Sequence, residues 1–162
     1  MKNKLKNLIK PFFYRILQFS INLAIRSQGL LKIKDQITEL VSDVTHQYTT
    51  HTVDSPYLTT KVRALHSFQV YLASHAVRKV KEDSVTLVDI GDSAGTHIQY
   101  LNGIFPKLIN PYSVNLDPIA VQKIKDKGLR AINTRAEDLL DHPEFDQLSI
   151  EVFLLFETME HL

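Results

Sequence analysis

The 162-residue sequence predicts an α/β fold: a parallel sheet of about four strands, flanked by helices and preceded by a helical amino-terminal segment. In the carboxyl half, short apolar runs bounded by glycine or proline alternate with helical patterns, as in βαβ units. In the amino-terminal half, apolar residues recur at helical spacing only. We therefore expect a helical region over residues 1–80 and a sheet domain over residues 81–162.

Composition is ordinary for a globular protein, with 44% hydrophobic and 23% charged residues. The chain has no cysteine, which excludes disulfides, thiolate metal sites and cysteine nucleophiles and fits a cytoplasmic location. Residues 1–34 hold eight Lys/Arg and no acid, whereas residues 35–162 hold eleven Lys/Arg against eighteen Asp/Glu, hence a net −7. Nucleic-acid-binding proteins more commonly carry a basic patch on the folded body, so a nucleic-acid partner is less expected than a small molecule or a glycan or lipid precursor.

The stretch VTLVDIGDSAGTHIQYL, residues 85–101, reads as a buried strand, a sharp turn and a helix. Its first six residues are mostly apolar, as a strand covered on both faces requires. Gly91 lets the backbone turn sharply and a ligand approach, because it has no Cβ. We expect Ser93 or Thr96 to cap the helix. In an open α/β sheet a nucleotide-like ligand binds above such a strand end, so the turn is predicted to be a ligand loop.

Residues 88–95, VDIGDSAG, resemble the first motif of class I S-adenosylmethionine-dependent methyltransferases, an acidic residue followed by alternating glycines. Ser93 stands where the family has its middle glycine. Three later stretches follow in the family's order: SVNLDP (113–118), RAEDL (135–139) and, after Phe145-Asp146, LLFETMEHL (154–162). The resemblance covers about half of the chain and implies a Rossmann-like domain that binds S-adenosylmethionine.

The resemblance implies cofactor contacts for four residues around the first turn. Asp89 is expected to help hold the amino-acid part of the cofactor, and it can also bond the N–H groups of its own turn. Gly91 and Gly95 supply bare backbone to the ligand loop. Ser93 narrows the space where the ligand comes closest.

The second strand, predicted over residues 112–116, ends in this family with a carboxylate that pairs with the ribose hydroxyls. Asn115 matches this place if the next helix begins two residues later, and Asp117 matches it by charge. Asp117 followed by Pro118 is also a favourable helix start, so both assignments stay open.

Further along, the pattern predicts a helix over residues 119–127 and strands over 129–133 and 151–156. By resemblance, the adenine contacts fall to the backbone of Ala136 and to Glu137, which would accept a bond from the exocyclic amine. Glu137 can equally be a solvated turn residue.

Glu157 follows the last predicted strand and is expected to lie over the cofactor pocket. Glu160 and His161 are the catalytic candidates, because histidine has a pKa suited to a general base at neutral pH. His161 can instead be a structural residue at the next helix. Methyl transfer needs mainly alignment of the acceptor with the methyl group, so a dedicated base is not required. We predict no metal site.

Residues 1–34 show apolar residues at helical spacing, interrupted by Pro11, and Gly29 is predicted to end this segment. The longest uncharged run has ten residues, too few to span a membrane. The segment is either an interfacial helix that contacts anionic lipid or an amphipathic helix packed on the sheet domain.

Two further helices are predicted over residues 33–48 and 61–80, separated by a polar loop over 49–60. In the family, segments before the first strand often contribute to the substrate pocket. The substrate-side candidates are Tyr57, His66 and Tyr71.

A complete domain of this family has about seven strands, so we expect a truncated gene product, a partial record, or a homodimer that covers the open sheet edge. The leading hypothesis is methyl transfer to an unknown acceptor, either a small molecule or a glycan or lipid precursor. The alternatives are an inactive remnant or interaction module, and a dinucleotide-binding domain, which the missing GxGxxG pattern disfavours. The expected location is cytoplasmic, with membrane contact through residues 1–34 as an open alternative.

Overall fold

The computed structural model describes residues 2–146 and 148–156. The helices are α1 (Lys2–Ser27), α2 (Leu31–Leu40), α3 (Pro56–Lys79), α4 (Thr96–Ile104) and α5 (Pro118–Asp126). The strands are β1 (Val85–Ile90), β2 (Ile109–Val114), β3 (Ala131–Ile132) and β4 (Val152–Leu154). Two short 3-10 helices, η1 (Leu139–Asp141) and η2 (Pro143–Phe145), precede β4.

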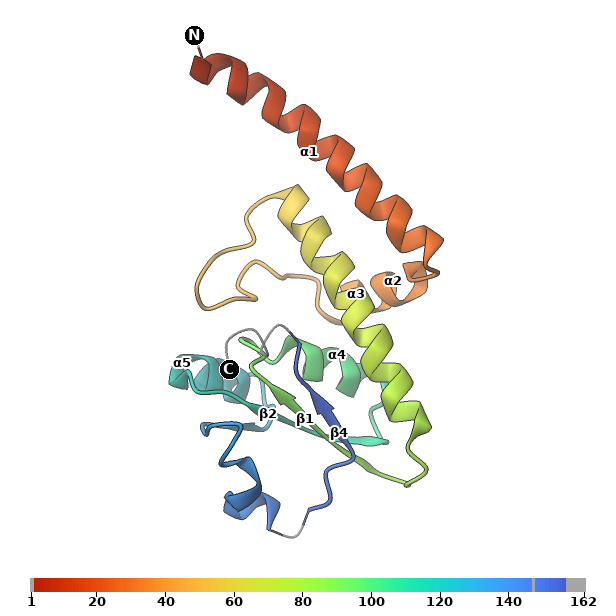
Figure 1. Ribbon diagram of the computed structural model, residues 1–162, viewed down its shortest axis with the longest axis vertical. Coiled ribbons are helices and arrows are strands. Elements are labelled where there is room, and N and C mark those ends of the chain that lie inside the picture. Colours follow the sequence, from red (N-terminus) through yellow and green to blue (C-terminus); the bar gives the residue numbers. More distant parts are fainter. Residues whose placement is uncertain (1, 147, 157–162) are drawn as a thin grey trace.

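The sheet confirms the predicted fold class. Its four strands are all parallel and follow the order β3-β2-β1-β4 (Figure 1). The chain adds β2 and β3 on one side of β1 and then places β4 on the other side. The direction of strand addition therefore reverses between β1 and β4, which creates a switch point at the carboxyl ends of these two strands.

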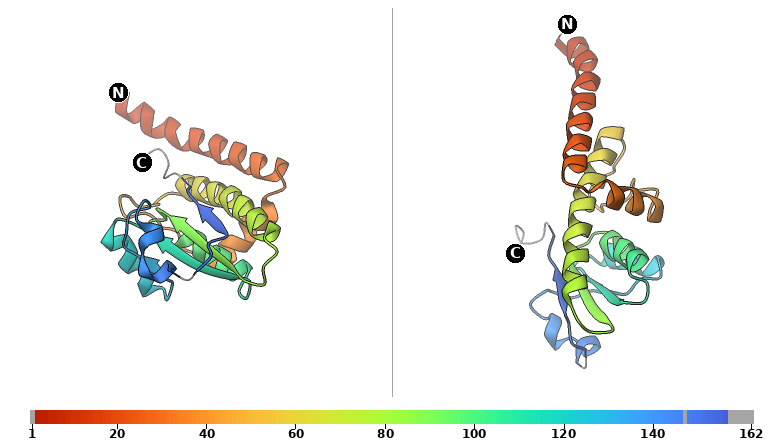
Figure 2. Two further views of the ribbon diagram at one scale, coloured as in Figure 1. Left: turned by 60° about the horizontal axis from the view of Figure 1, so that its bottom comes forward. Right: turned by 90° about the vertical axis from the view of Figure 1, so that its right-hand side faces the viewer.

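Side chains of β1 are buried on both faces of the sheet, as its apolar sequence predicts. Val85 and Leu87 pack with residues of α3, α4 and α5, whereas Val88 and Ile90 pack against the segment that carries η1 and η2. Figure 2 shows α1 as an outer layer over α3, with the sheet on the far side of α3.

The predicted helix over 33–48 is wrong in its second half, because α2 ends at Leu40. The Arg63 guanidinium donates hydrogen bonds to the backbone carbonyls of Ile37, Val41 and Ser42. The Ile37 carbonyl also accepts a hydrogen bond from the N–H of Val41 at 3.1 Å. The bonds to Val41 and Ser42 satisfy carbonyls that a continuing helix would otherwise pair with its own N–H groups.

The predicted loop over 49–60 is too long, because α3 begins at Pro56. The Ser55 side chain accepts a hydrogen bond from the N–H of Leu58 at 3.3 Å. A serine cap followed by proline at the first helical position is a favourable start for a helix.

The predicted interruption at Pro11 does not occur, since α1 continues through this residue. The helix ends at Ser27, and Gly29 has the predicted left-handed backbone with φ 71°. Tyr14 stacks on Tyr57 of α3 with ring centroids 4.7 Å apart. No helix in the described part of the chain is long and apolar enough to cross a membrane.

Strand boundaries differ from prediction mainly at β2, which begins at Ile109, three residues before the predicted start at residue 112. Pro111 lies inside this strand opposite Leu87. Strands β3 and β4 are shorter than predicted, with two and three residues. Helix α5 ends one residue before the predicted position, and Gly128 follows with φ 74°.

Candidate functional site

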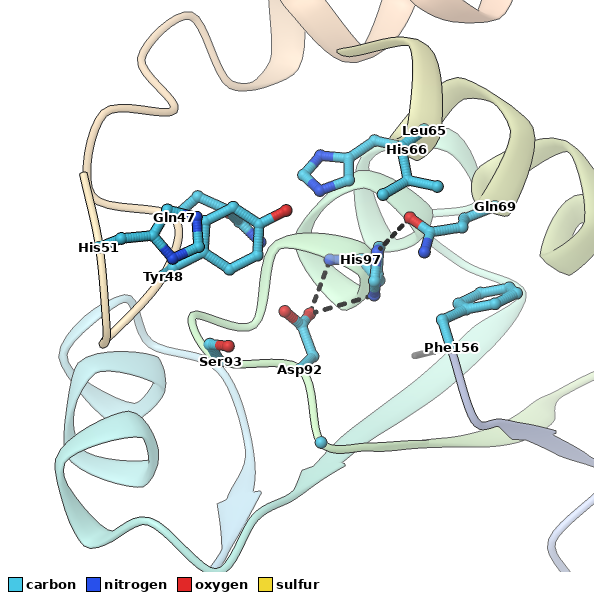
Figure 3. A pocket seen from close by; sticks show the side chains of 11 residues that line it. Gln47, Tyr48, His51, Leu65, His66, Gln69, Asp92, Ser93, His97 and Phe156 are labelled. Atoms are coloured by element: carbon cyan, nitrogen blue, oxygen red, sulfur yellow. Dashed lines mark hydrogen bonds and ion pairs between the residues drawn. The ribbon is translucent and has the colours of Figure 1, made fainter. Parts of the chain in front are cut away.

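A pocket of about 300 Å³ lies above the turn between β1 and α4, at the switch point of the sheet (Figure 3). Its walls come from the loop between α2 and α3, from α3, from the β1–α4 turn and from the residues after β4. The described lining residues are Gln47, Tyr48, His51, Leu65, His66, Gln69, Gly91, Asp92, Ser93, His97 and Phe156. Ligands of open α/β sheets bind in this position.

Two glycines shape the turn. Gly91 has φ 90° and lines the pocket, so ligand atoms can approach bare backbone there. Gly95 has φ 68° and lies behind the turn, where a Cβ would come within 3.0 Å of the Ile124 side chain. The Lys127 ammonium donates a hydrogen bond to the Ala94 carbonyl at 2.5 Å. The turn is therefore held from behind by the α5 region while its front faces the pocket.

The expected capping of α4 by Ser93 or Thr96 is wrong. Asp92 caps the helix instead. Its carboxylate accepts hydrogen bonds from the N–H of His97 at 2.8 Å and from the N–H of Ala94 at 3.5 Å. The hydroxyl of Thr96 instead donates to the side chain of Gln47. Ser93 is consequently left in the pocket wall.

Asp89 lies beneath the pocket and is almost completely buried. Its carboxylate is 3.1 Å from Nδ1 of His97, and Nε2 of the same ring is 3.0 Å from Oε1 of Gln69 (Figure 3 draws the second contact). Burial raises the pKa of Asp89 to about 6; Asp92 acts in the same direction, and His97 opposes it. A chain of polar side chains thus links β1 to α3 through the first turn of α4.

A second polar group lies deeper, between α3 and α4. The hydroxyl of Tyr100 accepts a hydrogen bond from Arg63 at 2.9 Å and lies 3.3 Å from Nδ1 of His66. Burial lowers the pKa of His66 well below its ordinary value, and His97 and Arg63 lower it further. His66 therefore presents an uncharged imidazole to the pocket at neutral pH.

Asp89, Asp92 and His97 each place one potential metal-ligand atom within 4.8 Å of the others. These atoms already have partners. Asp92 caps α4, and both ring nitrogens of His97 are engaged by side chains. These contacts therefore explain the cluster of three residues as a structural support of the turn between β1 and α4.

The structure places the residues predicted around the first turn in different positions. Gly91 and Ser93 line the pocket, Asp89 lies below it, and Gly95 lies behind the turn. Their expected cofactor contacts stay predictions.

The two residues predicted to meet the ribose lie outside the pocket lining. Asp117 caps α5 by accepting a hydrogen bond from the N–H of Ile119 at 2.8 Å. Asn115 accepts from the N–H of Asp117 at 2.9 Å and donates to the carbonyl of Asp92 at 3.4 Å. Asn115 thus ties the end of β2 to the ligand turn, and the choice between the two residues stays open.

On the predicted adenine side, Glu137 is exposed and forms an ion pair with Arg135 at 2.9 Å. The carbonyl of Ala136 accepts a hydrogen bond from the N–H of Leu139 at 3.4 Å. Neither residue is among the described lining of the pocket. The remaining predicted site residues, Glu157, Glu160 and His161, lie outside the residues that the structure describes.

Of the substrate-side candidates, only His66 is among the described lining residues. Tyr57 stacks on α1, and Tyr71 is exposed on α3.

His97 and Gln69, which hold the floor of the pocket, are not among the residues predicted from the sequence. His97 follows the turn at a spacing that places it in the first turn of α4, which is a usable sequence signal. Gln69 has no local signal, because its partner is twenty-eight residues away.

No protein-family model, curated protein or solved structure matches this chain.

Proposed function

We propose that this chain carries the cofactor-binding part of an S-adenosylmethionine-dependent methyltransferase of class I. The observation that carries the proposal is the pocket above Gly91, at the switch point of a parallel sheet and over the turn whose sequence resembles the family's first motif. Fold and position support a nucleotide-like ligand, and the motif resemblance supports this particular one.

The residues around the turn fit such a cofactor. Bare backbone at Gly91 admits close approach, and Asp92 in the wall offers a negative charge to the cofactor's amino and sulfonium groups. S-adenosylmethionine supplies a methyl group on a positively charged sulfur, which is the electrophile of the reaction. The uncharged His66 and the ring of Phe156 complete a wall that does not repel this charge.

The acceptor, in this proposal, is a small molecule or a glycan or lipid precursor, bound from the side of α3 and the loop before it. Positioning is the main contribution of the protein, because methyl transfer depends on alignment of acceptor and methyl group. The competing proposal is a domain that keeps the fold and binds cofactor or partner without turnover. A cytoplasmic location fits the lack of cysteine.

Calorimetric titration of the chain with S-adenosylhomocysteine, with NAD as the control ligand, tests the proposal. We expect saturable binding of S-adenosylhomocysteine alone. Ser93→Leu should abolish this binding by filling the pocket. Ser93→Gly should preserve or strengthen the binding, because it leaves more space where the ligand approaches the turn most closely. If a folded sample binds neither ligand, or if Ser93→Leu leaves the affinity unchanged, the assignment of this pocket is wrong.

A further inference from the structure

Helix α1 has an inner face that packs on the body of the protein. Gln18 donates a hydrogen bond to the hydroxyl of Thr60 at 3.2 Å, and Tyr14 stacks on Tyr57. The less exposed residues of this face recur at helical spacing: Tyr14, Gln18, Ile21 and Ile25. Contact with α3 therefore accounts for one side of α1.

The opposite side of α1 is also apolar, and it is exposed. Its residues repeat the same spacing, so they form one line along the helix, which we call the outer stripe. The outer stripe consists of Phe12 (63% exposed), Ile16 (45%), Phe19 (69%) and Leu23 (55%). The outward side of a surface helix is ordinarily polar, and a continuous exposed apolar line marks an interaction site.

Charge indicates what this site contacts. Residues 1–34 contain eight Lys/Arg and no acidic residue, whereas residues 35–162 carry a net −7. Arg15 and Arg26 are exposed on α1 itself. An apolar line on an exclusively basic helix complements a surface that is apolar inside and negatively charged outside.

The position of α1 leaves the outer stripe accessible. Figure 1 shows α1 reaching away from the sheet toward the amino terminus, and Figure 2 shows it as the outermost layer. The helix has 26 residues, so it is about 39 Å long at 1.5 Å per residue. A flat surface can therefore meet the stripe without meeting the sheet.

We propose that α1 docks this protein on the surface of an anionic lipid bilayer, lying in the interface with its outer stripe inserted. A second copy of the chain fits less well, because pairing two outer stripes would bring two acid-free basic segments together. This inference rests on α1 alone and is independent of the proposed cofactor site.

Flotation of the whole chain with vesicles tests the inference. We expect binding to vesicles of phosphatidylcholine with 30% phosphatidylserine and at least tenfold weaker binding to pure phosphatidylcholine. Phe12→Ser with Phe19→Ser should abolish binding. Arg15→Gln with Arg26→Gln should weaken it about fivefold for each charge removed.

The matched control exchanges two exposed apolar residues of the sheet domain, Ile119→Ser (63% exposed) and Leu140→Ser (72%). This variant should bind anionic vesicles like the original chain, and circular dichroism should show all variants folded. Equal loss in control and stripe variants would overturn the inference, as would a folded original chain that does not float. If the stripe variant instead converts a dimer to a monomer on size exclusion, with no vesicle binding, the outer stripe is an interface between copies.

Discussion

Asp89 lies beneath the proposed cofactor pocket, where burial makes its negative charge unfavourable. The pKa of this carboxyl is raised to about 6 from the ordinary 3.8. The folded protein therefore binds more protons than the unfolded chain between these two values, so the free energy of unfolding falls as pH rises through this window. This shift in pKa lowers the free energy of unfolding by about 3 kcal/mol at pH values where Asp89 is ionised in both the folded and the unfolded protein.

Asp89→Asn removes this titration and keeps an oxygen that can accept a hydrogen bond from the His97 ring. We expect the variant to be more stable than the original chain at pH 7. The difference in free energy of unfolding between the two proteins should grow by about 2 kcal/mol between pH 4.5 and pH 7. Titrating groups that do not interact with Asp89 contribute to both proteins alike. The same variant should bind S-adenosylhomocysteine more weakly. A buried carboxylate that lowers the stability of the fold is expected to be retained because it contributes to ligand binding.

Urea denaturation followed by far-ultraviolet circular dichroism at several pH values measures the gap. A gap that does not change with pH, or a variant less stable than the original chain at pH 7, would refute this account of Asp89.

Four further substitutions test the supports of the site, each by the free energy of unfolding in urea. Ser55→Ala removes the cap of α3 and should destabilise the protein by about 1 kcal/mol; no change would show that the cap is dispensable. Gly95→Ala and Gly128→Ala both place a side chain at positive φ, at a cost of about 1–2 kcal/mol. Only Gly95→Ala also crowds Ile124, so it should be the more destabilising of the pair, and equal effects would contradict the packing described. Tyr100→Phe deletes the hydroxyl between two buried partners and should cost about 1–3 kcal/mol, whereas a neutral effect would mean that these partners do not depend on it.

Local chemistry was sufficient to predict the architecture of the sheet. The apolar run of β1 predicted a strand buried on both faces, and Gly29 predicted the end of the segment before it. Asp117 and Pro118 predicted the start of α5 correctly, because a helix start depends on neighbouring residues only.

Interactions between distant segments explain what the sequence did not reveal. Val44 continues the helical spacing of α2, yet it is buried from an irregular segment, where it packs with Val53 and Val62. The side chain that binds the carbonyls at the end of α2 is Arg63, which lies more than twenty residues further along the chain. The contact between His97 and α3 could not be predicted for the same reason, because no local sequence pattern indicates a partner on another helix.

The most direct test of the proposed cofactor site is a nuclear magnetic resonance titration of the ¹⁵N-labelled chain with S-adenosylhomocysteine. We expect saturable shifts of the amide resonances of Gly91 and Ser93 and of neighbouring residues in the pocket wall, and no such shifts with NAD. Absence of shifts at these amides, or shifts confined to a surface remote from the turn between β1 and α4, would contradict the account.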